Sequence, residues 1–203
     1  IVDSGTFDWA QNDKYPSLAQ PEEAYHGLNF YESFGDLAYT TYGHAVGLRD
    51  LGPTMAPMNA YLTIMGIETL ALRMEKHVAN AEVVANYLHN HAKVSWVSYA
   101  GLEESNYFHL AKKYLPKGAG SVFTFGIKGG YDAGVKFVEK CQLLSHLANI
   151  GDTRSLVLHP ASTTHRQLIE TQRISAGAGD DVIRLSIGLE TVEDIIADLE
   201  QAL

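Results

Sequence analysis

Arg184 is a candidate for binding a carboxylate. It lies in the segment DVIRLSIGLE, residues 181–190, where apolar residues alternate with others in the pattern of a β-strand that has two different faces. One face would be formed by Ile183, Leu185 and Ile187. A guanidinium group offers planar, paired N–H donors that match the two oxygens of a carboxylate. An arginine on a solvated strand face produces the same pattern and is the more common case, so the alternation alone does not assign a binding role.

A second candidate segment is NIGDTRSLVLHPASTTH, residues 149–165. Gly151 is flanked by Asn149 and Asp152, a combination that lets the backbone turn closely past a ligand, although a simple loop between strands is also compatible. His159 and His165 are six residues apart and do not match the i, i+4 spacing of ligands on a helix. The spacing therefore favours capping or packing roles for these histidines, and no metal site is predicted.

The sequence contains none of the short motifs that identify a catalytic centre. GxSxG, CxxC, HExxH and EF-hand patterns do not occur, and the glycines of KGG at 128–130 lack the context of a phosphate-binding loop. His44 in TTYGHAVG is typical of a loop histidine. The residues by themselves predict an α/β domain with one polar edge that could bind a ligand, without a mechanism.

Composition restricts the class of protein. A chain of 203 residues with 46% hydrophobic residues favours a globular fold, and a net charge of −9 disfavours binding to nucleic acid. The single cysteine, Cys141, leaves no intrachain disulfide and is typical of a reducing compartment, so we expect a cytoplasmic protein. No run of roughly 18 apolar residues occurs, so no membrane span is predicted, and the first residues do not resemble a signal peptide.

Three regions can be distinguished along the chain. Residues 1–52 are rich in aromatic residues and turn formers without a sustained period, which predicts a long irregular segment. Apolar residues recur at mixed spacings of three and four from Pro53 to about His91, which predicts one long helix over 53–91. Residues 92–203 alternate between β-branched runs and amphipathic segments and predict a small α/β domain. In it we expect strands within 94–101, 120–130, 146–150, 155–160 and 181–190, and helices within 102–118, 131–144, 163–172 and 191–203.

The first residues, IVDSGTFDW, do not include an initiator Met and have the character of a continuing strand. We therefore expect this chain to be part of a longer protein.

Four segments together resemble the C-terminal half of the Cys/Met-metabolism family of pyridoxal-phosphate (PLP) enzymes. They are GLRDLGPTMAPMNAYLTIMGIETLALRMEKHVANA, KGAGSVFTFGIKGG, NIGDTRSLVLHPASTTH and VIRLSIGLE. The resemblance covers essentially all 203 residues. It implies an α/β fold of the aspartate aminotransferase type (fold type I). Residues 1–52 would be the tail of the large PLP-binding domain, 53–91 a linking helix, and 92–203 the small C-terminal domain with a mainly antiparallel sheet.

The resemblance also implies that the catalytic lysine lies elsewhere. In this family the lysine that forms the Schiff base with PLP lies in a Ser/Thr-rich stretch upstream of a strand like IVDSG, and Lys14 in QNDKYPS does not match it. The resemblance therefore predicts a missing N-terminal half that carries this lysine and most of the cofactor site. No catalytic residue is expected in this chain, and its cofactor-binding residues stay unassigned.

Substrate-binding residues are implied by position within the family. Arg184 matches the arginine that binds the substrate α-carboxylate, and Asn149, Ile150 and Gly151 match the wall of the substrate site. Thr164 matches a threonine of the same wall, and Arg154 stands where relatives that cleave cystathionine or methionine have Glu. A cation there disfavours substrates with a distal ammonium group.

Asn149 in place of a Ser of cystathionine-handling relatives, Thr163 in place of their Met and Arg154 in place of Glu resemble the O-acetylhomoserine sulfhydrylase branch of the family. The implied reaction is a γ-replacement in which sulfide displaces acetate from O-acetyl-L-homoserine and gives L-homocysteine, a step of methionine biosynthesis. Family members are homotetramers built as dimers of dimers. Two alternatives stay open: another PLP enzyme of the family, such as methionine gamma-lyase or a cystathionine synthase or lyase, and a non-catalytic truncated binding module.

Overall fold

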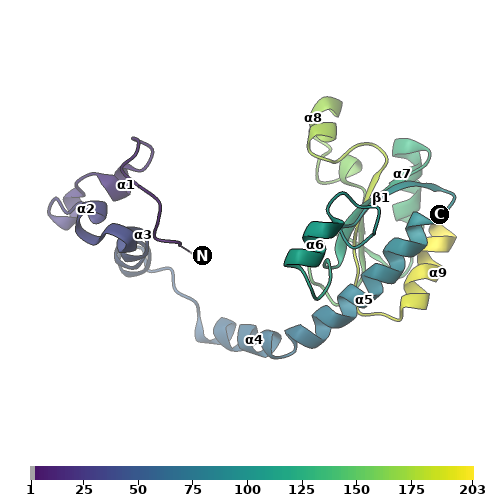
Figure 1. The fold of residues 1–203 in the computed structure, drawn as a ribbon, viewed down its shortest axis with the longest axis horizontal. Helices are drawn as coiled ribbons and strands as arrows, with labels where there is room; N and C mark the ends of the chain where they lie inside the picture. The colour runs from purple at the N-terminus through teal and green to yellow at the C-terminus, as the bar shows by residue number, and fades with distance from the viewer. Residues whose placement is uncertain (1–2) are drawn as a thin grey trace. The chain divides into compact units, whose positions relative to one another are not determined.

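The computed structural model describes residues 3–203, which separate into two compact units (Figure 1). The first unit extends to Ile64 and the second runs from Met65 to Leu203. No helix within residues 3–203 has both the length and the apolar character needed to cross a membrane.

The first unit consists of short helical segments rather than the irregular segment predicted over 1–52. The α-helices are Pro16–Ala19 (α1), Phe30–Phe34 (α2) and Ala38–Tyr42 (α3), with 3-10 turns at Glu23–Tyr25 and Gly35–Leu37 and a π-helix at Gly43–Asp50. Each helix is too short to show a hydrophobic period, so the sequence pattern missed them. They pack around the buried side chains of Leu18, Phe30 and Ala38.

The predicted long helix over 53–91 is two helices. Residues 53–56 are not helical, α4 spans Pro57–Glu68, and α5 spans Leu70–His89 after a break at Thr69. The Arg73 guanidinium donates to the carbonyl of Gly66 at 2.5 Å and to the Thr69 hydroxyl at 3.4 Å, so the side chain satisfies an acceptor at the break. Apolar residues on several sides of α4 are exposed. They are Met58, Tyr61, Leu62, Ile64, Met65 and Ile67.

The second unit is built on a mainly antiparallel sheet, as predicted. Its strands, in chain order, are Val94–Ser98 (β1), Val122–Ile127 (β2), Ser145–His146 (β3), Leu156–Leu158 (β4) and Val182–Ser186 (β5). Within the described residues they form a five-stranded sheet in the order β1-β2-β5-β4-β3. Only the β3–β4 pair of this sheet is parallel. Strand β5 therefore has hydrogen-bonded neighbours on both sides.

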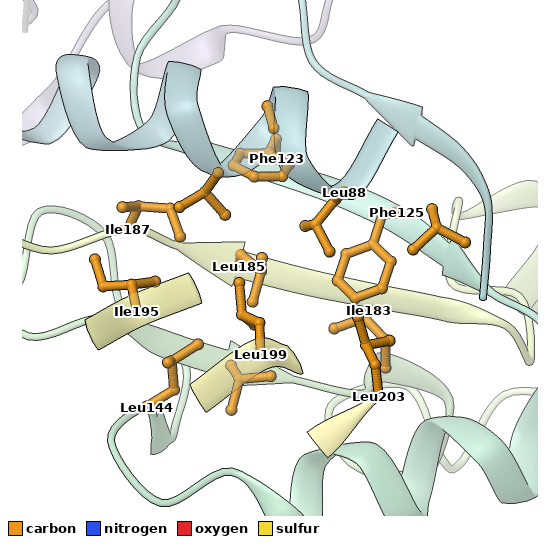
Figure 2. Close-up of a cluster of buried hydrophobic side chains, with 14 of the residues drawn as sticks. Leu88, Phe123, Phe125, Leu144, Ile183, Leu185, Ile187, Ile195, Leu199 and Leu203 are labelled. Atoms are coloured by element: carbon orange, nitrogen blue, oxygen red, sulfur yellow. The ribbon is translucent and has the colours of Figure 1, made fainter. Parts of the chain in front are cut away.

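One face of the sheet forms the hydrophobic core. Ile183 and Leu185 of β5 lie on this face and are fully buried. Figure 2 shows them packed with side chains from the neighbouring strands and from the helices α5 and α9 (Val192–Ala202). Helix α7 (Gly130–Lys140) contributes to the same core. The packed residues include Leu88, Phe123, Phe125, Phe137, Val157, Ile195 and Leu199. Because side chains alternate along a strand, Arg184 points to the opposite face.

The segments between the strands differ from the prediction in two places. Helix α6 spans Phe108–Tyr114, as expected within 102–118. The strand expected at 146–150 is limited to Ser145–His146, and the helix expected at 163–172 begins later, as α8 over Glu170–Ser175. A 3-10 turn at Pro160–Ser162 precedes it, and the hydroxyl of Thr163 donates to the carbonyl of His159 at 2.8 Å. Such local side-chain bonds compete with helix formation, which explains the later start.

Helix α9 is joined to the turn before β3 by a buried carboxylate. Asp198 is 7% exposed and accepts hydrogen bonds from the backbone N–H groups of Gln142, Leu143 and Leu144 at 2.8, 2.9 and 3.0 Å. Burial raises the pKa of Asp198, but these donors and the Gln201 amide outweigh burial and lower the pKa below its ordinary value of 3.8.

The Asp198→Asn substitution should lower the free energy of unfolding by about 2 kcal/mol at pH 7, because the charged acceptor of three backbone N–H donors is lost. The carboxylate has a lowered pKa in the folded state, so its contribution is complete above the unfolded value of 3.8 and disappears as the pH falls through the folded pKa. The stabilities of wild type and variant should therefore converge below about pH 4. Denaturant unfolding from pH 7 to pH 3 measures this, and a difference that does not change with pH would contradict it.

Candidate functional site

Arg184 occupies the middle of the central strand β5, on the face opposite the core. Its neighbours in register are Thr124 on β2 and Leu158 on β4, so its backbone is fixed by hydrogen-bonded strands on both sides. The side chain is half-buried, and one guanidinium nitrogen donates to the carbonyl of Asn149 at 3.3 Å. Within residues 3–203 the guanidinium forms no ion pair with a carboxylate. It is therefore a positioned cation whose remaining donors can receive an anion.

The structure brings Asn149 to Arg184, and Ile150 and Gly151 follow Asn149 in an exposed turn. Gly151 has φ +76°, a left-handed conformation that favours glycine. The Asn149 side-chain oxygen accepts from the N–H of Ile150 at 2.9 Å, and the Ile150 side chain is exposed. These residues form an accessible rim beside the guanidinium, and their direct contact with a substrate stays a prediction.

Arg154 is paired with an acid of its own loop. Asp152 accepts from the backbone N–H of Arg154 at 3.1 Å and from its guanidinium at 3.4 Å. The hydrogen bond from the Arg154 N–H, followed by those from its side chain and from Asn149, lowers the pKa of Asp152, so this carboxylate stays charged at neutral pH. The Arg154 charge is thus partly balanced, and its side chain is exposed.

Thr164 and the histidines have local partners. The Thr164 hydroxyl lies 2.8 Å from Nδ1 of His165, and no contact among the described residues joins Thr164 to Arg184 or Asn149. His159 is fully buried, with Nδ1 2.9 Å from the Ser162 hydroxyl and Nε2 donating to the Asp180 carbonyl at 3.0 Å. His159 therefore has the packing role that the spacing favoured.

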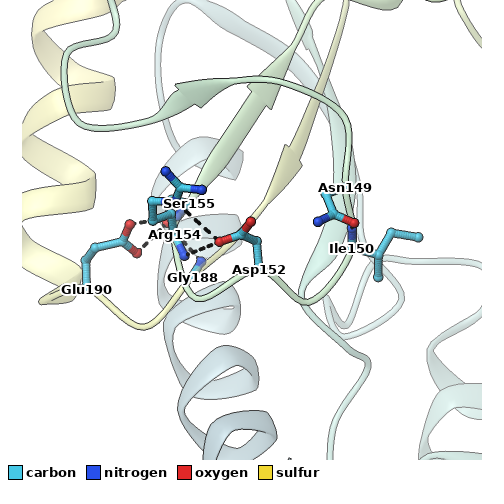
Figure 3. Close-up of polar contacts among 7 residues, drawn as sticks. All are labelled: Asn149, Ile150, Asp152, Arg154, Ser155, Gly188 and Glu190. Carbon is cyan, nitrogen blue, oxygen red and sulfur yellow. Dashed lines mark hydrogen bonds and ion pairs between the residues drawn. The ribbon is translucent and has the colours of Figure 1, made fainter. Parts of the chain in front are cut away.

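Two residues that the sequence patterns did not single out, Ser155 and Glu190, support the loop 149–155 (Figure 3). The Glu190 carboxylate accepts from the Ser155 N–H at 2.6 Å and from the Ser155 hydroxyl at 2.8 Å. The Ser155 hydroxyl accepts from the N–H of Gly188 at 2.9 Å. These partners are more than 30 residues apart in the chain, so no local pattern could have revealed them.

The described residues do not form a site for pyridoxal phosphate by themselves. A lysine that forms a Schiff base must present an amine in a desolvated pocket, but every lysine of the described chain is exposed. Lys14 lies in a polar turn where its backbone N–H donates to the Asn12 side chain at 3.0 Å.

The free thiol is also inactive, because burial, together with the Asp198 charge, raises the pKa of Cys141 to about 12. Within residues 3–203, no three His, Cys, Asp or Glu side chains are grouped to hold a metal ion.

The chain belongs to the Cys/Met metabolism PLP-dependent enzyme family, whose sequence profile matches residues 3–203. This result confirms the family inferred from the four sequence segments and the fold that they implied.

Relatives within the family are sulfhydrylases and homocysteine synthases. The chain is 50% identical to the homocysteine synthase of Schizosaccharomyces pombe and 46% identical to O-acetyl-L-homoserine sulfhydrylase 1 of Thermus thermophilus. Each match covers 100% of this chain and 48% of the relative, so the chain spans about half the length of these relatives. A crystal structure of a putative O-acetylhomoserine (thiol)-lyase from Campylobacter jejuni matches with a TM-score of 0.83 and 43% identity. The match covers 96% of this chain and 46% of that one, and that protein carries a pyridoxyl-lysine phosphate.

The backbone at Gly188, just after β5, lies close to the loop 149–155. A Cβ at this position would lie 2.4 Å from a Glu190 carboxylate oxygen and 2.5 Å from backbone atoms of Arg154 and Ser155. Backbone cannot move aside as a flexible side chain can, so Gly188→Ala should destabilise the fold by about 1–3 kcal/mol. At Gly179 a Cβ meets its nearest atom at 3.4 Å, an ordinary contact, so Gly179→Ala is the matched control. Thermal unfolding compares the two, and equal melting temperatures would refute the close approach.

Proposed function

We propose that the intact protein containing this chain is an O-acetyl-L-homoserine sulfhydrylase. In the proposed reaction the bond between the γ-carbon and the ester oxygen breaks, acetate leaves, and sulfide forms a C–S bond that gives L-homocysteine. The names of the relatives support this substrate pair, and the positioned cation at Arg184 supports an amino-acid substrate.

The observation that carries the proposal is the state of Arg184. Its side chain is half-buried, its backbone is fixed within the sheet, and its one hydrogen-bond partner within residues 3–203 is the neutral carbonyl of Asn149. A partly buried guanidinium has lost part of its hydration and here has no counter-ion among the described residues. It therefore binds a carboxylate more strongly than an exposed arginine does. An α-carboxylate held by the guanidinium would have its orientation fixed by the rigid strand, as productive binding requires.

Arg154 supports the choice of substrate side chain. O-acetyl-L-homoserine carries a neutral ester at its distal end, whereas cystathionine carries an ammonium and a carboxylate. The Arg154 guanidinium on the loop 149–155 would repel the distal ammonium of cystathionine and would not repel the neutral ester. Asn149, Ile150, Gly151 and Thr164 would form the wall of the substrate site, as the family resemblance implies.

The cofactor of the proposed enzyme is pyridoxal phosphate, which withdraws electrons from the α-carbon of a bound amino acid. The described residues do not hold it by themselves, so the role of this chain is to bind and orient the substrate. The exposed apolar side chains of α4 support a homo-oligomer, and a dimer of dimers stays the prediction from the resemblance. A cytoplasmic location also stays a prediction.

Product analysis tests the proposed reaction. The intact protein, supplied with pyridoxal phosphate, O-acetyl-L-homoserine and sulfide, should form homocysteine and acetate in equal amounts. Formation of 2-oxobutanoate and ammonia from methionine in the absence of sulfide would instead identify a methionine gamma-lyase. Binding without turnover of either substrate would support the non-catalytic alternative.

Arg184→Ala should raise the KM for O-acetyl-L-homoserine by about 30- to 100-fold, the order expected for loss of a charge-assisted hydrogen-bonded pair. The kcat should fall by a smaller factor, because kcat reports only on enzyme with substrate bound, where misorientation of the substrate is the remaining defect. Arg184→Lys should be intermediate, since lysine keeps the charge without the paired donors. Lys136→Ala on α7, which removes an exposed cation from a helix that packs against the core face, is the control and should leave the KM unchanged. An unchanged KM in Arg184→Ala would refute the role of the guanidinium.

A further inference from the structure

The carboxylate of Glu190 joins two segments that are distant in sequence. One oxygen accepts from the Ser155 N–H at 2.6 Å and the other from the Ser155 hydroxyl at 2.8 Å, so both oxygens bind a single residue (Figure 3). Ser155 is fully buried, and its N–H and hydroxyl donors have the Glu190 carboxylate as their acceptor. The interaction is a two-point restraint on the start of strand β4.

The backbone that carries Glu190 is itself held in place by helix α5. Asn80, which is buried, donates to the carbonyls of Gly188 and Glu190 at 3.0 and 2.8 Å. His77, also buried, donates through Nδ1 to the carbonyl of Ile187 at 2.6 Å. Glu190 thus lies on a segment that is hydrogen-bonded to helix α5. Its carboxylate binds Ser155 and so holds Ser155 in a fixed position relative to that helix.

The loop between Asn149 and Ser155 depends on few contacts. The Asn149 carbonyl accepts from Arg184, and the Thr153 carbonyl accepts from the N–H of Leu189 at 2.8 Å. Ser155 is bound by Glu190, its hydroxyl accepts from the N–H of Gly188, and its carbonyl accepts from the N–H of Ser145 at 2.9 Å. The intervening side chains of Ile150 and Arg154 are exposed. A loop held at so few points is expected to change its average position when one of them is lost.

We propose that Glu190 is a positioning residue that fixes the loop 149–155 so that the Asn149 carbonyl lies correctly beside the Arg184 guanidinium. This inference rests on the proposed function for its kinetic consequence. Glu190 does not contact the substrate. It fixes the peptide that links Arg154 to Ser155, which determines the direction of the Arg154 side chain, and it preserves the carbonyl that orients the Arg184 guanidinium.

The test compares Glu190→Ala and Glu190→Gln in the intact protein. Glu190→Ala should raise the KM for O-acetyl-L-homoserine roughly tenfold, the order expected for loss of a hydrogen-bonded charged group, and should leave the KM for sulfide unchanged. In Glu190→Gln the amide oxygen can still accept from the Ser155 N–H, so this variant should retain most of the wild-type KM. A purely structural role would lower the amount of active enzyme and the apparent kcat without this selective change in KM.

Asp198→Asn is the matched control. Asp198 is also a carboxylate that accepts backbone N–H groups, but those belong to residues 142–144. This variant should lose stability while keeping both KM values. Hydrogen exchange provides a readout independent of activity: the amides of 149–155 should exchange faster in Glu190→Ala and at the wild-type rate in Asp198→Asn.

The outcomes distinguish this inference from the proposed function. If the wild type forms homocysteine and Glu190→Ala keeps its KM, the positioning role is wrong. If the wild type forms no homocysteine, the proposed function is wrong, and hydrogen exchange alone decides the inference: unchanged exchange at 149–155 would overturn it, and faster exchange would support it. If Glu190→Ala does not fold, Ser155→Ala, which removes the hydroxyl that donates to Glu190, carries the test, with faster exchange at 149–155 as the expected result and unchanged exchange as the contradiction.

Discussion

The alternation of strand β5 is the constraint on which the second unit depends. Ile183 and Leu185 enter the core from one face, while Arg184 between them points to the other. A shift of one residue in register would place the guanidinium in the hydrocarbon core and two large apolar side chains at the binding face. The core therefore fixes the position of the arginine, because the apolar residues on both sides of it cannot leave the core.

Buried polar groups extend this rigidity from the strand to the loops around it. Asn80 and His77 on α5 bind the carbonyls that follow β5, and Glu190 then binds Ser155 at the start of β4. Among the described residues, Nε2 of His77 is a buried polar atom without a partner. The remaining groups of this network are satisfied by one another, which allows a polar cluster to lie beside the hydrophobic core at little cost.

The sequence predicted the sheet better than the segments that connect it. The β-branched and aromatic runs around Phe123 and Ile183 correctly identified β2 and β5, because such runs are typical of half-buried strands. Periodicity did not reveal the short helices of the first unit or the break at Thr69, since the break involves side-chain contacts that a hydrophobic period does not encode. Residue alternation left Arg184 undecided between a surface and a binding role, and only the family resemblance favoured binding. The Glu190–Ser155 contact spans 35 residues and became visible only in the structure.

The most direct test of this account is a crystal structure of the intact protein with a bound, unreactive analogue of O-acetyl-L-homoserine. We expect both carboxylate oxygens of the analogue to lie within hydrogen-bonding distance of the Arg184 guanidinium, with the Asn149 carbonyl beside it and the Glu190–Ser155 contacts retained. A carboxylate bound by another group, with Arg184 still contacting only the Asn149 carbonyl, would contradict it.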